Sequence, residues 1–200
     1  MNRTFAFGVS AVFHPVFVNL LSLLTLIFLC PILSFAITPQ AKLYYIVFVF
    51  VTTGIIPILF ILLYTWLGRI QSILLDVQHE RNIPYLITAS LYLFNYYIFS
   101  KTGAPPFIIA YVIGCACVVV AVAIINHFYK ISAHGASLGA LTGILLAISS
   151  AAIIDMRLLL AFVIVISGLT LSARLFLAAH TLPQVLLGWI LGLSIMYLIF

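Results

Sequence analysis

Long apolar stretches separated by short polar breaks dominate this chain. A helix needs about 20 largely apolar residues to cross a bilayer, and several of the stretches reach that length. Charged residues, proline and glycine mark the breaks. They delimit seven apolar segments, at residues 15–37, 43–67, 84–100, 106–127, 134–154, 158–178 and 185–200. The third and the seventh are short, so the pattern predicts six or seven membrane crossings.

The crossings are expected to be helical, because backbone polar groups in hydrocarbon must pair within the protein. No stretch shows the alternating pattern of a membrane β-strand. The expected fold is an all-α, polytopic transmembrane helical bundle that forms a single integral-membrane domain over residues 1–200. The first apolar run is expected to be a retained span, since it is far longer than the apolar core of a signal peptide.

Composition supports a membrane protein and excludes several other classes. The 200 residues are 66% hydrophobic and only 6% charged, whereas about a quarter of a soluble domain is charged. The net charge of +5 is spread between the apolar segments, so it forms no basic patch for nucleic acid. Cys115 and Cys117 have no His or Cys nearby with metal-ligand spacing. We therefore expect neither a metal nor a cofactor.

Two glycine runs predict close helix packing. Gly135, Gly139 and Gly143 recur every four residues, and Gly188 and Gly192 do the same near the C-terminus. This spacing places the glycines on one face of a helix, where small residues let a neighbouring helix approach closely. Both runs are expected to be packing surfaces.

The few charges gather on one side of the membrane if all seven segments cross it. The N-terminus and the loops at 68–83, 128–133 and 179–184 then share one face. The ionisable and polar residues expected at that face are Arg69, Asp76, His79, Glu80, Arg81, Lys130, Ser132, His134, Arg174, His180 and Gln184. Ionisable residues at this depth are usually functional. The arrangement predicts a cationic pocket at the mouth of the bundle.

An anionic ligand is the natural partner of such a pocket. In a chain without soluble domains, the expected anion is a lipid phosphate or a lipid-linked diphosphate. Arginine offers a rigid donor fork for phosphate, and lysine offers a point charge. Histidines beside them supply a nucleophile or a general acid near neutral pH. Phosphoryl transfer is therefore the expected reaction class.

The residues that would carry this chemistry resemble the type 2 phosphatidic acid phosphatase superfamily. Ser172-Ala173-Arg174, followed by His180, Gln184-Val185, Gly188 and Gly192, resembles the third signature of that family. The run from Lys130 to Gly135, Lys-Ile-Ser-Ala-His-Gly, resembles the second, which is Pro-Ser-Gly-His. The two histidines, His134 and His180, lie 46 residues apart, with room for two helices between them. The resemblance covers residues 69–192.

The resemblance implies a role for each matching residue. The histidine at His180 would attack phosphorus and form a phosphohistidine, and His134 would serve as general acid and then general base. Arg174, Arg81 and Ser132, with Lys130 and the backbone N–H groups near Gly135, would hold the phosphate oxygens. The mechanism requires no metal. The substrate would enter laterally from the bilayer, and the family often works at the outer face of a bacterial inner membrane.

The sequence departs from the family pattern at two places. Gln184 replaces the acid that orients the nucleophilic histidine, and a neutral amide cannot stabilise an imidazolium by charge. The first signature, Lys-x6-Arg-Pro, is met only by Arg81-Asn82-Ile83-Pro84, because position 74 is Leu. Glu80 is a candidate replacement for the missing acid; the alternative is that it pairs with Arg81 or caps the following helix. His79, beside it, is a further candidate, whereas His14 and His127 are interpreted as interfacial.

Two functions remain open at this point. The first is a lipid phosphate or lipid diphosphate phosphatase that acts through a phosphohistidine. The second is a catalytically impaired protein of the same fold that binds, transports or senses an anionic lipid. The Lys and Arg counts of the loops do not decide which side of the membrane the pocket faces.

Overall fold

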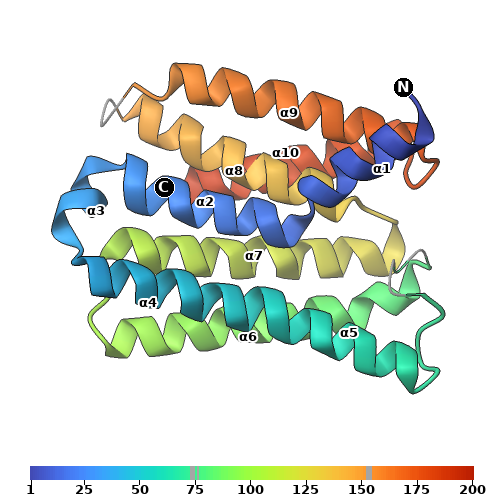
Figure 1. Ribbon diagram of the computed structural model, residues 1–200, viewed down its shortest axis with the longest axis horizontal. Helices are drawn as coiled ribbons and strands as arrows, with labels where there is room; N and C mark the ends of the chain where they lie inside the picture. Colours follow the sequence, from blue (N-terminus) through green and yellow to red (C-terminus); the bar gives the residue numbers. More distant parts are fainter. Residues whose placement is uncertain (73–74, 76, 152–154) are drawn as a thin grey trace. The chain divides into compact units, whose positions relative to one another are not determined.

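The computed structural model describes residues 1–72, 75, 77–151 and 155–200. All regular secondary structure in these residues is helical. The chain divides into two compact units (Figure 1). The terminal unit comprises Met1–Ile37 and Ile131–Phe200, and the middle unit comprises Thr38–Lys130.

The terminal unit is built around helix α8, which is the most buried of its long helices. Helices α10, α9 and α2 pack against α8, and α1 packs against α9 (Figure 1). Their bounds are α1 (Arg3–Val12), α2 (Pro15–Leu29), α3 (Pro31–Ala36), α8 (Ala133–Ser150), α9 (Arg157–Phe176) and α10 (Leu182–Ile199). The first residues of α8, including His134 and Gly135, are therefore buried within this unit.

Helices α8 and α10 approach each other through the two glycine runs. A Cβ atom added at Gly139 would overlap the backbone carbonyl oxygen of Trp189, and one added at Gly192 would overlap that of Ala136. A Cβ at Gly188 would lie 2.5 Å from the carbonyl oxygen of Ser132. The prediction of close packing is confirmed, and the two runs pack against each other.

The middle unit is held by larger side chains. Helix α4 (Pro39–Phe50) continues through a π-helix (Val51–Ile55) into α5 (Ile56–Trp66). Helices α6 (Asn82–Lys101) and α7 (Pro106–Phe128) pack closely together, and α6 also contacts the π-helix. Ring contacts join Phe48 to Phe94 and Phe99. Tyr45 also contacts Phe99, so the later residue of α4, Phe48, reaches the earlier residue of α6, Phe94. The two helices therefore run antiparallel.

Five helical stretches of the described chain are long and apolar enough to cross a membrane. They are Pro39–Trp66, Pro106–Phe128, Ala133–Ser150, Arg157–Phe176 and Leu182–Ile199. A sixth is reached if α1 and α2, which meet at a 45° bend, count as one span. The expected helical membrane fold is confirmed, whereas six or seven crossings are not. Residues 84–100 do form a helix, α6, but its polar residues make it less apolar than these five stretches.

The N-terminal region differs most from the prediction. The expected span at 15–37 is interrupted, because α2 ends at Leu29 and α3 begins at Pro31, whose ring nitrogen has no hydrogen to donate. Residues 3–12, which precede the first expected segment, form the amphipathic helix α1. Its Ala6 and Val9 are buried against Ala173 of α9. The hydropathy pattern missed α1 because ten residues are too few for a span.

Candidate functional site

A tight turn between α9 and α10 positions two of the expected site residues. Arg174 lies in the last turn of α9, and His180 lies two residues before α10 begins. The turn passes through Ala178, whose φ of +54° is in the left-handed region. The N–H of Ala179 donates to the carbonyl oxygen of Arg174 at 3.1 Å. The turn thus brings Arg174 and His180 to the same end of the helix pair.

The ring of His180 is oriented by Gln184. Oε1 of Gln184 accepts the backbone N–H of Thr181 at 3.1 Å, as part of a capping box at the start of α10. Because a backbone N–H only donates, this bond fixes the amide oxygen toward His180. Nδ1 of His180 lies 3.1 Å from the same oxygen and must carry the hydrogen. The neutral ring therefore has its lone pair on Nε2.

Ser132 joins the start of α8 to α10. Its hydroxyl accepts the N–H of Gly135 at 3.2 Å and caps the helix, and its own N–H donates to the carbonyl oxygen of Gln184 at 3.2 Å. Ser132 is fully buried. The N–H of Gly135, one of the groups expected at phosphate, is thus engaged by the cap. In this arrangement Ser132 and Gly135 serve helix capping and packing.

His134 lies at the centre of a histidine cluster, which consists of His14, His134, His180 and Arg174. Nε2 of His134 donates to the carbonyl oxygen of Ser10 at 3.1 Å. Its ring meets that of His14 edge to face, with centroids 5.6 Å apart. Arg174 and His180 both lie within electrostatic range of His134, and Arg174 also acts on His14. The structure therefore brings His134, His180 and Arg174 close enough to interact electrostatically.

His14 is the residue that the sequence interpretation missed. It caps α2, and its Nδ1 accepts the N–H of Val16 at 3.4 Å. Nε2 of His14 therefore carries the hydrogen of the neutral ring. The available signal was topological: His14 precedes the first apolar segment on the same expected face as His134 and His180. The bend between α1 and α2 places His14 beside α8, which no local pattern indicates.

Buried hydroxyls and an indole N–H also occur on α1, α9 and α10 of the terminal unit. Ser10 Oγ, Thr170 Oγ1 and Trp189 Nε1 are buried and have no hydrogen-bond partner among the described residues. Ser10 supplies the carbonyl that accepts from His134, and Thr170 lies one turn before Arg174 on the same face of α9. These groups are donors that lack an acceptor, which is the complement of an oxyanion.

The remaining predicted cations belong to the middle unit. Nε of the buried Arg81 donates to the carbonyl oxygen of Leu75 at 2.7 Å, and Arg81 also interacts with the Tyr85 side chain. Lys130 is the last residue of that unit, two positions before Ser132. The assignments of Arg81 and Lys130 to phosphate stay predictions.

Glu80 also makes a local contact. Its Oε1 accepts the backbone N–H of Gln71 at 3.0 Å, across the loop between α5 and α6. The proposed partnership of Glu80 with His180 stays a prediction. The alternative role, in which Glu80 pairs with Arg81 or caps the following helix, stays a prediction as well.

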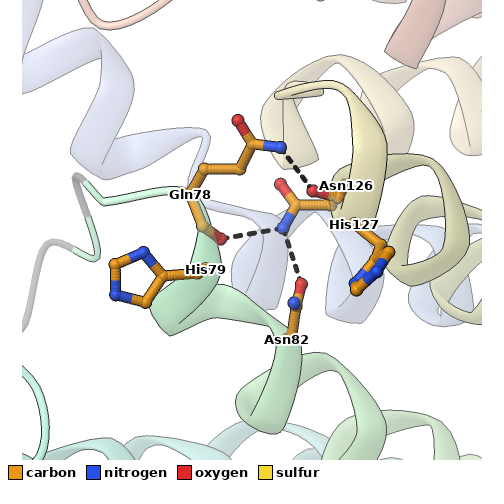
Figure 2. A pocket seen from close by; sticks show the side chains of 5 residues that line it. All are labelled: Gln78, His79, Asn82, Asn126 and His127. Atoms are coloured by element: carbon orange, nitrogen blue, oxygen red, sulfur yellow. Dashed lines mark hydrogen bonds between the residues drawn. The ribbon is translucent and has the colours of Figure 1, made fainter.

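His79 contributes to a different site, which we call the amide pocket. It lies within the middle unit, where the loop before α6 meets the end of α7 (Figure 2). Its lining residues are Gln78, His79, Asn82, Asn126 and His127. The interfacial interpretation of His127 therefore misses its place in a pocket.

Neither site has the ligands of a typical metal centre. Across residues 1–72, 75, 77–151 and 155–200, no group of three or more His, Cys, Asp or Glu side chains is arranged to hold a metal ion. Comparisons of the chain with protein-family models, with curated proteins and with solved structures found no match, so its chemistry has to be argued from the histidine cluster and the amide pocket themselves.

Proposed function

We propose that this chain is a membrane-embedded lipid phosphate or lipid diphosphate phosphatase that acts through a phosphohistidine at His180. The observation that carries the proposal is the orientation of His180 by Gln184. The hydrogen on Nδ1 leaves the lone pair on Nε2, which is the form of the ring that can attack phosphorus. The resemblance to type 2 phosphatidic acid phosphatases assigns the same role to this residue.

The reaction has two balanced steps. In the first, Nε2 of His180 forms a bond to phosphorus while the bond from phosphorus to the lipid oxygen breaks, and the departing oxygen takes a proton from a general acid. In the second, water attacks the phosphohistidine and releases inorganic phosphate, as the general base accepts the water proton. Free His180 is then restored.

His134 is the proposed general acid and base, with a constraint on which nitrogen acts. Nε2 of His134 already donates to the carbonyl oxygen of Ser10. The transferred proton must therefore be carried on Nδ1. His134 acts as the acid from its doubly protonated form and as the base from its neutral form. The contact with Ser10 holds the ring in one orientation, which is the usual role of a hydrogen bond to the second nitrogen of a catalytic histidine.

Binding of the phosphate is supported by the surroundings of the histidine cluster. Arg174 supplies a fixed positive charge with a planar donor fork. The hydroxyls of Ser10 and Thr170 are buried donors that lack an acceptor among the described residues. Phosphate oxygens would satisfy such donors, and charge-assisted hydrogen bonds to them are stronger than neutral ones.

Gln184 predicts slow turnover. Its oxygen fixes the tautomer of His180, but it provides no negative charge as His180 becomes positive during attack. In a serine protease, the amide replacement of the corresponding acid lowers the rate about 10⁴-fold, because the amide favours the wrong tautomer. Here the capping bond from Thr181 fixes the oxygen toward the ring, so we expect a smaller loss.

A second candidate function is non-catalytic binding of an anionic lipid. Two observations favour it, namely the neutral side chain at Gln184 and the engagement of Nε2 of His134 by Ser10. In both functions the ligand is a phosphate-bearing lipid in the bilayer, and we propose a bacterial inner membrane as the location. The two candidates differ in whether phosphate is released.

The deciding experiment is an assay of inorganic phosphate release by the purified chain in detergent micelles. The substrates are phosphatidate, phosphatidylglycerophosphate and a polyprenyl diphosphate. We expect release from at least one of them and its loss in His180→Ala. Tyr197→Ala, which removes an exposed aromatic side chain from α10, is the control and should retain activity. Binding of these lipids without release from any of them would favour the second function.

A further inference from the structure

The amide pocket is a second polar site, separate in sequence from the histidine cluster. Figure 2 shows the five side chains that line it. The volume of the pocket is about 250 Å³. That volume corresponds to roughly eight water molecules at about 30 Å³ each. It is therefore large enough for a small ring compound.

Three amide side chains build a fixed wall. Nε2 of Gln78 donates to the backbone carbonyl oxygen of Asn126 at 2.7 Å. Nδ2 of Asn126 donates in return to the backbone carbonyl oxygen of Gln78 at 2.9 Å. The same Nδ2 donates to Oδ1 of Asn82 at 2.9 Å (Figure 2). Both hydrogens of the Asn126 amide are thus used, which fixes the direction of its oxygen.

The side-chain oxygen of Asn126 lacks a hydrogen-bond donor among the described residues. Asn126 is fully buried, and its Oδ1 has no hydrogen-bond partner within the part of the chain that the structure describes. A buried polar atom without a partner is rare and calls for a ligand or ordered water. Because Oδ1 only accepts, the missing group must be a donor.

The described lining favours an uncharged ligand with hydroxyl groups. It consists of three amides and two imidazoles, none of which supplies the fixed positive charge that a phosphate site typically uses. Asn82 accepts the hydrogen bond from Asn126 through Oδ1, so the hydrogens of its Nδ2 are not used in it. Each neutral imidazole of His79 and His127 offers one donor and one acceptor. A hydroxyl group donates and accepts, and so matches all of these groups.

The position of the pocket indicates where the ligand comes from. The pocket lies where α6 begins and α7 ends. Because α4 and α6 are antiparallel and α5 contacts α6, α5 ends there as well. Exposed aromatic residues, Trp66, Phe128 and Tyr129, mark this end of the helices. Such residues gather at the level of lipid headgroups. We propose that the amide pocket binds the uncharged, polyhydroxylated headgroup of a membrane lipid.

The test uses the full chain in nanodiscs and a lipid with a phosphate-free sugar headgroup, monoglucosyl diacylglycerol. Diacylglycerol is the control lipid, and free glucose is the arm that separates the headgroup from the lipid. We expect monoglucosyl diacylglycerol to bind at least tenfold more tightly than diacylglycerol. Free glucose should bind weakly or not at all. Tighter binding of glucose than of the lipid would assign the site to a soluble sugar instead.

Two exposed lining residues provide variants that keep the wall intact. His79→Ala and His127→Ala are each expected to weaken binding of monoglucosyl diacylglycerol at least fivefold, with an unchanged unfolding temperature. Lys101→Ala, at the opposite end of α6, is the matched control and should bind normally. Equal binding of diacylglycerol, preferential binding of phosphatidate, or equal losses in Lys101→Ala would overturn the proposal.

One further variant separates this proposal from the phosphatase. His180→Ala should still bind monoglucosyl diacylglycerol as the parent chain does, even though it releases no phosphate. Loss of sugar-lipid binding in His180→Ala would contradict a separate site.

Discussion

The two units bring polar groups together by different means. In the terminal unit, glycines let the backbones of α8 and α10 touch, and a backbone hydrogen bond from Ser132 to Gln184 crosses between them. In the middle unit, the ends of α6 and α7 are joined by the side-chain amides of Asn82 and Asn126. Contact between backbones holds α8 and α10 at a fixed distance, because a backbone has no side-chain rotamers to change. The positions of α6 and α7 at the amide pocket depend instead on the side-chain conformations of a few amides.

This difference suggests why the proposed chemistry and the proposed binding lie in different units. Catalysis requires reacting groups to be held within a fraction of an ångström. The glycine contact places His134 at the start of α8 and Gln184 at the start of α10 in a common frame. A headgroup pocket tolerates more variation, because hydroxyl groups find partners in several directions. Four substitutions test the comparison.

The largest expected effect is that of a side chain inserted between α8 and α10. Gly139→Leu would place bulk against the Trp189 carbonyl, where even a Cβ overlaps. We expect a loss of more than about 3 kcal/mol, at or above the upper end of overpacking costs, and little folded protein. Fluorescence-detected size exclusion measures this. Gly168→Leu on α9, where a Cβ meets nothing within 4 Å, should leave the elution profile unchanged.

A smaller effect is expected from the amides of the middle unit. Asn126→Ala removes the donors to Gln78 and Asn82. We expect a loss of about 1–3 kcal/mol, the cost of leaving buried partners unpaired, seen as a lower unfolding temperature. Ser90→Ala removes only a bond to the carbonyl of its own helix and should change stability by less than about 0.5 kcal/mol. Similar values for both variants would mean that the amides do not hold this end of the unit.

Removal of the cap on α8 should cost about 1 kcal/mol. Ser132→Ala takes away the acceptor for the N–H of Gly135, and the loss of a serine cap typically has this size. Ser150→Ala, in the last turn of the same helix, is the control. Thermal unfolding compares the two. The backbone hydrogen bond from residue 132 to Gln184 survives the substitution. An effect as large as that of Gly139→Leu would therefore contradict the claim that backbone contacts hold α8 and α10 together.

The smallest effect is expected at the exposed ion pair between Asp155 and Arg157. Hydrogen bonds from Arg157 lower the pKa of Asp155 from 3.8 to about 2. A lowered pKa stabilises the folded state at pH values above the ordinary pKa, and this contribution disappears as the pH falls through the folded-state value. The unfolding temperatures of Asp155→Asn and the parent should therefore differ slightly and constantly above pH 4, and converge between pH 4 and pH 2. A gap that changes between pH 5 and pH 8 would show that another group titrates.

The sequence predicts the terminal unit better than the middle unit, for physical reasons. Glycine spacing is a local pattern, and it correctly indicated the packing of α8 and α10. The spacing of His134 and His180 also correctly left room for two helices. The bend between α1 and α2 has a local cause, because Pro15 begins α2 and the preceding His14 is extended. The contribution of His14 to the cluster depends in addition on the packing of α2 against α8, which no local pattern indicates. The amide pocket depends on residues 78 and 126, which are far apart in sequence and carry no recognisable motif.

The break within residues 15–37 shows a further limit. The apolar content of that segment is continuous, so hydropathy alone predicts one span. Pro31 follows Cys30 and interrupts the helix, because its nitrogen has no hydrogen and the residue before a proline disfavours helical geometry. Proline within an apolar run is therefore the sequence signal for this break.

The most direct test of the account is to identify the phosphorylated residue during turnover. The purified chain is mixed with ³²P-labelled phosphatidate, quenched in alkali, and digested for mass spectrometry, since phosphohistidine survives alkali and is lost in acid. The account predicts an acid-labile phosphate on His180, absent from His180→Ala and trapped in greater amount in a His134→Ala variant that retains attack. Phosphate release with no labelled histidine, or label on a residue outside the histidine cluster, would contradict it.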